Sequence, residues 1–292
     1  MTEPRILLTG LVLGESPRWH QDRLWYCDWG SHELVTVDPA GQTAGHREVV
    51  AHVAAFPFCI DWLPDGRLLV LAGSDRMLLR REPDGSLVPH ADLRALCDRP
   101  WNEVAVDGRG YAYVNCIGFD LMTGKEPAAG LVAVVAPDGS ARRVAEDVAF
   151  PNGMAVTPDG STLILAESYA GRLTAFDIGA DGGLSGRRVW AAVDGAAPDG
   201  IALDAEGAVW YADVPNRCCV RVREGGEVLQ RIELDRGCFS CALGGPDGRT
   251  LFMTAAEWNG PAAAGSGTPT GQVLTATAPA PAAARPPRHP VH

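Results

Sequence analysis

Residues Pro151-Asn-Gly-Met-Ala-Val-Thr-Pro-Asp-Gly160 are followed later in the chain by Pro198-Asp-Gly-Ile-Ala-Leu-Asp-Ala-Glu-Gly207, which has the same layout. Each stretch begins with a polar residue between Pro and Gly, continues as a short apolar run and ends in a tight turn. Short apolar runs bounded by turn residues are typical of β-strands. The two stretches therefore indicate a strand-and-turn unit that recurs along the chain.

The turn sequence Pro-Asp-Gly is found throughout the chain. It lies at residues 64–66, 83–85, 137–139, 158–160 and 246–248. Proline sets φ at the first corner of a turn, aspartate bonds to its own backbone, and glycine accepts a positive φ. Runs typical of strands follow several of these turns, as in Leu68–Leu71 and Leu163–Leu165. No long segment has the period of a capped helix, so the sequence predicts an all-β protein.

An internal repeat organises these strands. Strands are expected to start at Leu24, Leu68, Tyr111, Leu163, Val209 and Leu251, which are 44, 43, 52, 46 and 42 residues apart. A second, shorter strand follows each of them, so each repeat supplies two hairpins and hence a sheet of four antiparallel strands. Six such sheets arranged radially form a β-propeller. We predict one six-bladed propeller over residues 1–277, with Arg5–Leu8 as the outer strand that closes the last blade.

Two segments depart from the repeat. The insertion Gly118–Gly130 lengthens the third repeat and accounts for its 52-residue spacing. Insertions on one face of a fold often shape a binding site, so we expect this loop to cover the substrate. Residues 278–292 are rich in Ala and Pro, and we expect them to form a disordered tail.

Charge and composition restrict the partners. The 292 residues include 25 Lys and Arg against 36 Asp and Glu, for a net charge of −11. Nucleic acids and anionic membranes attract basic proteins, so neither is expected as a partner. No apolar run approaches the roughly 20 residues that span a bilayer, and the first residues lack the pattern of a secretion signal. We therefore expect a cytoplasmic protein whose 8 cysteines are reduced thiols.

Polar residues recur at one register position of the repeat. The equivalent positions in the six repeats are Glu15, Phe58, Asn102, Asn152, Asp199 and Ser240. In a propeller these positions converge on the central channel, so four hard oxygen donors are expected there, two of them carboxylates. Two carboxylates in one channel repel each other unless a cation neutralises them, and such oxygens are typical ligands of Ca²⁺, Mg²⁺ or Mn²⁺. The alternative is that these residues cap strand ends and solvate a wet channel.

Four motifs together resemble the SMP-30/gluconolactonase/LRE family, which includes regucalcin and bacterial sugar lactonases. They are Leu13–Trp19, Ile60–Leu68, Pro151–Ala155 and Pro198–Asp204. The resemblance implies a six-bladed propeller with one catalytic divalent metal ion in its channel, Ca²⁺ being favoured over Zn²⁺, Mg²⁺, Mn²⁺ and Fe²⁺. The metal-binding Glu, Asn and Asp of the family fall on Glu15, Asn152 and Asp199. Its substrate-contacting Asn falls on Asn102, and Glu103 replaces the Asp that follows it.

The chain departs from this family at one position. Sugar lactonases of the family commonly carry an Arg two residues before the substrate-contacting Asn, and Pro100 stands there in this chain. We expect Phe58 and Trp101 to join Asn102 and Glu103 in contacting the substrate, and to make the mouth of the channel more apolar than a polyol needs. The alternative is that these aromatic residues pack between blades.

The function that follows is a divalent-metal-dependent hydrolase of a lactone or related ester. Its metal activates water or polarises the carbonyl, and Asp199 is the expected catalytic residue, a metal ligand that also accepts the proton of the water. The chain has no Gly-x-Ser-x-Gly motif and no phosphate-binding loop. Two alternatives remain: a biosynthetic enzyme of the same fold acting on a less polar lactone or acyl compound, and a propeller that binds metal or partners without catalysis.

Overall fold

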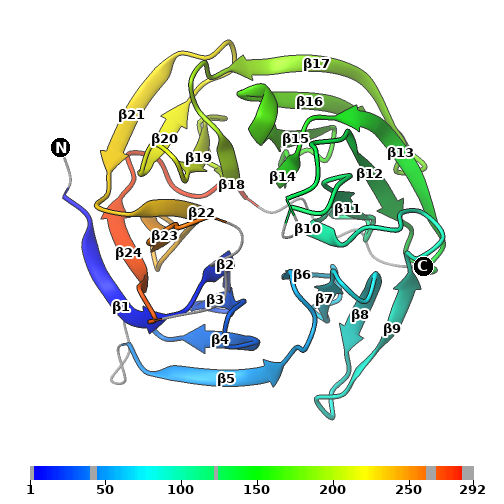
Figure 1. Cartoon of the computed structure of the whole chain (residues 1–292), viewed down its shortest axis with the longest axis horizontal. Helices are drawn as coiled ribbons and strands as arrows, with labels where there is room; N and C mark the ends of the chain where they lie inside the picture. Colours follow the sequence, from blue (N-terminus) through cyan, green and yellow to red (C-terminus); the bar gives the residue numbers. More distant parts are fainter. Residues whose placement is uncertain (1–2, 40–44, 122–123, 261–267, 285–292) are drawn as a thin grey trace.

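The computed structural model describes residues 3–39, 45–121, 124–260 and 268–284. Its strands form six four-stranded antiparallel sheets arranged as the blades of a ring around a central channel (Figure 1). The first three blades consist of β2 (Gly14–His20), β3 (Arg23–Asp28), β4 (Glu33–Val37) and β5 (Arg47–His52); β6 (Phe58–Trp62), β7 (Leu68–Ala72), β8 (Met77–Arg81) and β9 (Leu87–Asp92); and β10 (Trp101–Val106), β11 (Ala112–Cys116), β12 (Gly130–Val135) and β13 (Ala141–Val148).

The other three blades continue the same order from the channel outward. They consist of β14 (Pro151–Val156), β15 (Thr162–Glu167), β16 (Arg172–Ile178) and β17 (Leu184–Ala192); β18 (Pro198–Leu203), β19 (Val209–Asp213), β20 (Cys218–Val222) and β21 (Val228–Glu233); and β22 (Gly237–Gly244), β23 (Thr250–Ala256), β24 (Gly271–Thr277) and β1 (Arg5–Leu11). A 3-10 turn, η1 (Ser168–Ala170), follows β15. The six-bladed, all-β architecture predicted from the repeat is confirmed.

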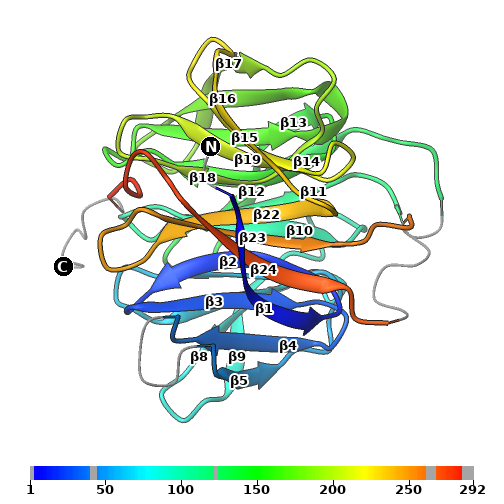
Figure 2. The same ribbon diagram turned by 90° about the vertical axis from the view of Figure 1, so that its left-hand side faces the viewer.

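The ends of the chain close the ring as predicted. Strand β1 pairs antiparallel with β24, with Ile6 opposite Leu274, so the first strand of the chain completes the last blade. Figure 2 shows β1 beside β24 in the side view. This pairing covers the outer edge of β24, which would otherwise be exposed for pairing with another chain.

The core lies between blades. Among the described residues, six large hydrophobic clusters each join two neighbouring blades. One of them contains Leu71 of the second blade and Val114 of the third, both fully buried. Side chains alternate between the two faces of a strand, so each sheet contributes to the cluster on either side of it. Packing between blades holds the inner strands at fixed positions around the channel.

The predicted Pro-Asp-Gly turns have the expected chemistry. In the turn at 158–160, Asp159 Oδ1 accepts a hydrogen bond from Ser161 N at 3.0 Å, and Gly160 has φ +71°. The other four turns repeat this arrangement. Three of them, at 64–66, 158–160 and 246–248, join the two inner strands of a blade, and the other two join its outer strands.

The segment after β24 differs from the expected disordered tail. Residues 278–284 pack on the molecule: Ala278 and Ala280 are buried, and Ala282 forms a β-bridge with Asp204. The physical reason is that small Ala side chains fit against blades five and six, and backbone groups of the segment hydrogen-bond to Leu203, Ala205, Gly248 and Arg249. Ala282, Ala283 and Ala284 also line a cavity of about 380 Å³ at one end of the channel. Residues 285–292 of the predicted tail lie outside the described residues.

Candidate active site

A second cavity, of about 400 Å³, lies at the other end of the channel, where the inner strands begin. Five of the residues predicted from the sequence line it together: Glu15 on β2, Asn102 and Glu103 on β10, Asn152 on β14 and Asp199 on β18. We call these five residues the floor of the cavity. Because they come from four blades, only closure of the ring brings them together.

At the floor residues the pairing between the first two strands of a blade is irregular. Their side chains therefore do not follow the regular alternation of a strand. The pairing register between the first two strands of a blade shifts next to Glu15, between Trp101 and Glu103, and after Pro151 and Pro198. Such β-bulges bend a strand and re-aim its side chains, and they are frequent next to active sites. Strand β6 pairs with β7 without any shift.

Glycines beside two floor residues allow the inner strands to approach closely. A Cβ atom on Gly153 would lie 2.6 Å from the Asp199 carbonyl oxygen, and one on Gly200 would lie 2.0 Å from Ser240 Oγ. Any side chain would force β14, β18 and β22 apart. The Asn-Gly and Asp-Gly pairs therefore place Asn152 and Asp199 on strands whose backbones are in contact.

The floor carries more negative charge than its protein surroundings neutralise. Burial raises the pKa of Glu15 well above its usual range, and the charges of Asp199 and Glu103 raise it further. Burial and the charge of Glu103 likewise raise the pKa of Asp199. Each carboxylate makes the charged form of the others less favourable. The described lining of the cavity contains no Lys, Arg or His.

One basic residue, which does not line the cavity, contacts the floor. Arg18 Nη2 donates to Glu103 Oε1 at 3.1 Å and to the carbonyl of Val104 at 3.1 Å. Both side chains of this ion pair are largely buried. Burial still raises the pKa of Glu103, although Arg18 and the amide of Val104 oppose that shift. Arg18 therefore compensates Glu103 and leaves Glu15 and Asp199 without a basic partner in the lining.

A chain of amide contacts links the floor residues. Asn102 Nδ2 lies 3.4 Å from Asn152 Oδ1, and Asn152 Nδ2 lies 3.4 Å from Ser168 Oγ. Asn152 also hydrogen-bonds to Asp199, which favours the charged carboxylate. The Ser168 hydroxyl donates to the carbonyl of Pro198 at 2.7 Å, next to Asp199. These contacts fix the orientation of both amides beside the two carboxylates.

Two residues expected to contact the substrate lie elsewhere. Phe58 and Trp101 are fully buried in the clusters between blades and are absent from the cavity lining. Phe58 occupies the channel register, but β6 has no bulge to turn its side chain inward. Trp101 lies before the irregular pairing of β10 and packs in the cluster between the second and third blades. Both side chains pack between blades, and neither lines the cavity where the prediction placed them.

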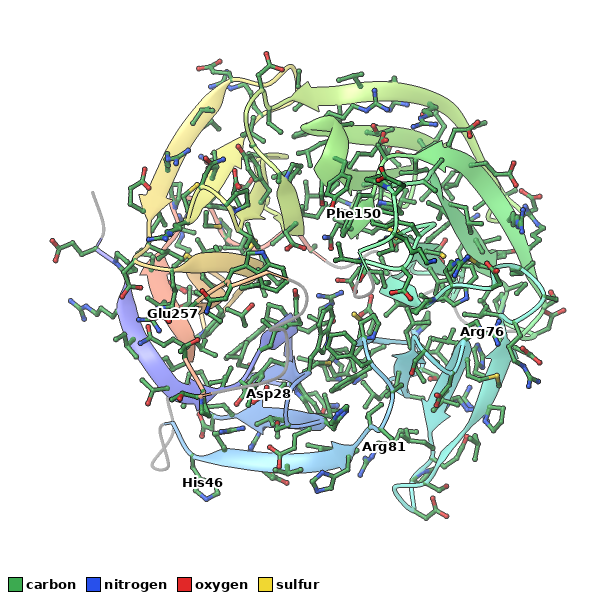
Figure 3. The ribbon with its side chains drawn as sticks, in the orientation of Figure 1. Asp28, His46, Arg76, Arg81, Phe150 and Glu257 are labelled. Atoms are coloured by element: carbon green, nitrogen blue, oxygen red, sulfur yellow. The ribbon has the colours of Figure 1, made fainter. Side chains whose placement is uncertain are left out.

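The walls of the cavity contain residues that the sequence analysis did not single out as a group. They are Trp29, Phe56, Phe119, Phe150, Tyr169, Phe239 and Trp258. In Figure 3, Phe150 lies toward the centre of the ring and His46 at its periphery. Pro100 lines the cavity, whereas Arg99 does not and pairs with Asp98 at 3.5 Å. The described part of the insertion Gly118–Gly130 contributes Phe119, Asp120 and Leu121, as expected of a loop at the site.

The floor has the donor chemistry of a divalent-cation site. Among the described residues, no three His, Cys, Asp or Glu side chains are grouped so as to hold a metal ion by themselves. The expected set instead combines the carboxylates of Glu15 and Asp199 with the amide of Asn152, and such mixed oxygen donors suit hard cations. Two buried carboxylates whose charge is otherwise unfavourable fit an ion of charge +2.

Comparison with known proteins agrees with this fold. Residues 13–257 match the SMP-30/gluconolactonase/LRE-like region. The chain is 30% identical to a pentonolactonase of Haloferax volcanii over 91% of this chain and 89% of the relative. It is 26% identical to a 6-deoxy-6-sulfogluconolactonase of Pseudomonas putida, over 85% and 84%. The crystal structure of a calcium-binding protein, regucalcin, from Agrobacterium tumefaciens has the same fold, with a TM-score of 0.76, 23% identity and coverage of 99% and 98%. The chain belongs to the SMP-30/gluconolactonase/LRE-like family.

Proposed function

We propose that this protein is a lactonase that depends on one divalent metal ion and opens a lactone ring by adding water to its carbonyl. Two relatives that align over most of the chain are named as lactonases, which supports the reaction class. The observation that carries the proposal is the pair of buried carboxylates, Glu15 and Asp199, on the floor of a cavity whose described lining holds no Lys, Arg or His.

The charge of the floor supports the metal. Glu15, Glu103 and Asp199 supply three carboxylates, and Arg18 compensates Glu103 from beneath. Two negative charges remain in a site whose burial disfavours them, and a divalent cation is the partner that matches them. Glu15, Asn152 and Asp199 would hold the ion, with Ca²⁺ favoured because the donors are oxygens and because a related structure is named as a calcium-binding protein. When bound, such an ion polarises a carbonyl and lowers the pKa of water.

The protein groups supply proton transfer and orientation. Asp199 accepts the proton that water loses as its oxygen attacks the lactone carbonyl carbon. When the bond between that carbon and the ring oxygen breaks, the proton passes from Asp199 to the ring oxygen, leaving a hydroxy acid. Asn152 hydrogen-bonds to Asp199 and keeps its carboxylate oriented. Asn102 offers its amide to the substrate from the neighbouring blade.

Metal removal tests the proposal. Protein treated with a chelator and then dialysed is assayed by pH-stat for hydrolysis of a panel of lactones, before and after addition of Ca²⁺, Mg²⁺, Mn²⁺, Zn²⁺ or Fe²⁺. We expect hydrolysis to be lost on removal and restored by about one equivalent of the preferred ion. Full activity in protein shown by elemental analysis to be metal-free would overturn the metal dependence. Failure of metal-loaded protein to hydrolyse any lactone would overturn the activity and favour a metal-binding propeller without catalysis.

A further inference from the structure

The walls above the floor are aromatic on nearly every side. Seven aromatic residues line the cavity, and we call them the aromatic wall: Trp29, Phe56, Phe119, Phe150, Tyr169, Phe239 and Trp258. They lie in or next to the loops on the side of the ring where the inner strands begin. Figure 2 shows the loop after β11 and the segment after β23 extending on one side of the ring, with the red C-terminal segment on the other.

The aromatic wall is built from rings that fix one another. Trp29 meets Phe56 edge-on at 5.3 Å, and its indole N–H donates to the carbonyl of Phe58 at 2.6 Å. Phe150 lies 4.5 Å from Tyr169 and 5.7 Å from Phe119. Because the one polar group of Trp29 is already bonded to the protein, its ring offers the cavity only carbon. Such contacts hold aromatic rings in defined orientations.

Two rings of the aromatic wall are unusually exposed for their size. Tyr169 is 54% exposed and Trp258 is 39% exposed, and both line the cavity mouth. Trp258 packs edge-on against Phe239 at 5.5 Å, which holds it over the cavity. Large apolar side chains left in water beside a concave site mark a surface that a ligand covers.

Polar groups of the lining are concentrated on the floor, where the reacting carbonyl must lie. Above it, the Ser168 hydroxyl already donates to the carbonyl of Pro198 at 2.7 Å. Among the described residues, Asp120, the hydroxyl of Tyr169 and the indole N–H of Trp258 are the polar side-chain groups that the wall adds. A polyol bound here would leave most of its hydroxyls against carbon, and buried hydroxyls without partners are costly.

Charged substituents find no partner either. The described lining holds no Lys, Arg or His, and Arg99 lies outside it beside Asp98. Asp120 adds negative charge to the wall. A sulfonate, phosphate or carboxylate on the substrate would therefore meet acidic groups and aromatic faces.

We propose that the substrate is an uncharged lactone that carries an alkyl or aryl group, with the ester on the floor and the apolar group against the aromatic wall. This inference rests on the proposed lactonase activity, because that activity places the ester. The volume of about 400 Å³ suits a small molecule with such a substituent. The substrate class thus differs from the sugar lactones after which two relatives are named.

Matched kinetics decide between the substrate classes. Metal-loaded protein is assayed with dihydrocoumarin and γ-nonalactone as apolar lactones, and with glucono-δ-lactone and a pentono-γ-lactone as polyols. We expect kcat/KM to be at least about 100-fold higher for the apolar pair, because a hydrophobic pocket discriminates by about 100-fold against one added hydroxyl and a sugar lactone carries several. An equal or higher value for either sugar lactone overturns the inference while leaving the lactonase activity intact.

Binding keeps the inference testable if no lactone is turned over. Calorimetric titration of metal-loaded protein with dihydrocoumarin and with glucono-δ-lactone measures affinity without catalysis. In that case the proposed activity fails, and tighter binding of dihydrocoumarin still supports the apolar site. Tighter binding of the sugar lactone overturns it.

A variant of the aromatic wall gives a direct structural test. Trp258→Ala removes a partly exposed ring, and Val228→Ala on β21 is its control, since Val228 is 55% exposed and does not line the cavity. We expect Trp258→Ala to raise KM for dihydrocoumarin about 10-fold or more, with an unchanged melting temperature, and Val228→Ala to leave KM unchanged. An unchanged KM in Trp258→Ala would contradict contact between the substrate and this ring.

Discussion

Glu15 and Asp199 occupy equivalent places on two inner strands, yet their surroundings give them different proposed roles. Asp199 hydrogen-bonds to Asn152, and Glu15 Oε2 accepts from the amide of Ser16 at 3.1 Å. Burial raises the pKa of both carboxyl groups. A bound cation would stabilise the charged form of each, and a proton acceptor must in addition reach the attacking water.

Two substitutions separate metal binding from proton transfer. Glu15→Gln removes one ligand charge, so we expect weaker metal binding and activity that excess metal partly restores. Asp199→Asn keeps an oxygen donor of similar size and removes the base. Excess metal should restore occupancy but not turnover, because general base catalysis contributes about 10²–10⁴-fold. Calorimetric metal titration and lactone hydrolysis on the same samples measure both effects. Near wild-type rates in metal-saturated Asp199→Asn would make Asp199 a ligand only, with Glu103 the next candidate base.

Arg18 is expected to matter for stability. Its guanidinium pairs with Glu103 at 3.1 Å in a largely buried setting. Arg18→Met leaves the Glu103 carboxylate without its counter-charge, and removing one partner of a buried pair costs about 3–5 kcal/mol. Urea denaturation of the metal-free protein measures the loss. The double variant Arg18→Met with Glu103→Met should lie closer to wild type, because the Glu103 carboxylate that loses its counter-charge in the single variant is then absent. A single variant as stable as wild type would show that Glu103 is adequately solvated without Arg18.

For single residues, the sequence predicted the floor of the cavity better than its walls. Glu15, Asn102, Asn152 and Asp199 share one distance to the following turn, so comparison of the repeats found them, and Glu103 came from the family motif. The register also selected Phe58, because a one-dimensional alignment does not reveal that β6 lacks a bulge. Residues of the aromatic wall such as Tyr169 share no repeat position, and their convergence depends on how the loops fold.

The connection between the second and third blades meets β11 at a pair of thiols. Cys97 follows β9 and lies three residues before Pro100, while Cys116 ends β11 at the start of the insertion. Their Sγ atoms are 2.6 Å apart. The contact joins the segments that lead into the cavity through Pro100 and Ile117. The sequence alone did not pair these residues, because Cys97 lies in the connection between two blades and Cys116 at the end of a strand.

This contact predicts an unusual pH dependence of thiol reactivity. Hydrogen bonding to Cys116 lowers the pKa of Cys97 to about 6, against the opposing effect of burial. The thiolate is the reactive form, so alkylation of Cys97 by iodoacetamide should remain fast down to about pH 6 and slow below it. Mass spectrometry of alkylated peptides after short exposures over pH 5–9 follows the rate. Cys97→Ser should abolish the fast-reacting site, and Cys218→Ser, which removes a fully buried thiol, should not. A midpoint near that of a free thiol would contradict the contact.

For the whole molecule, the repeat was the strongest sequence signal. The spacing of the turns fixed the number of blades and the order of strands, and the pairing of β1 with β24 followed from closure. Composition led to a wrong prediction for the C-terminal segment, residues 278–284. An Ala/Pro-rich segment has little to bury when it stands alone, but residues 278–284 find a complementary surface on blades five and six. Such a surface exists only after the ring has formed.

Truncation should distinguish the packed part of this segment from the rest. Deletion of residues 278–292 removes the buried Ala278 and Ala280 and the hydrogen bonds to blades five and six. Each hydrogen bond contributes about 0.5–1.5 kcal/mol, so we expect a loss of about 2 kcal/mol or more. Deletion of residues 285–292 alone is the control, since it keeps those contacts. Thermal denaturation of both variants should show a lower midpoint for the longer deletion only. Equal midpoints for both variants and the full chain would contradict a stabilising role of the segment.

The most direct test of the proposed lactonase is a metal titration followed simultaneously by occupancy and by turnover. Metal-free protein is titrated with the preferred divalent ion, bound metal is measured by calorimetry, and hydrolysis of dihydrocoumarin by aliquots of the same sample is measured at each point. We predict that hydrolysis rises in proportion to occupancy and reaches its plateau at about one ion per chain. Hydrolysis that is complete before any metal binds, or that stays absent when the site is full, would contradict a metal-dependent lactonase.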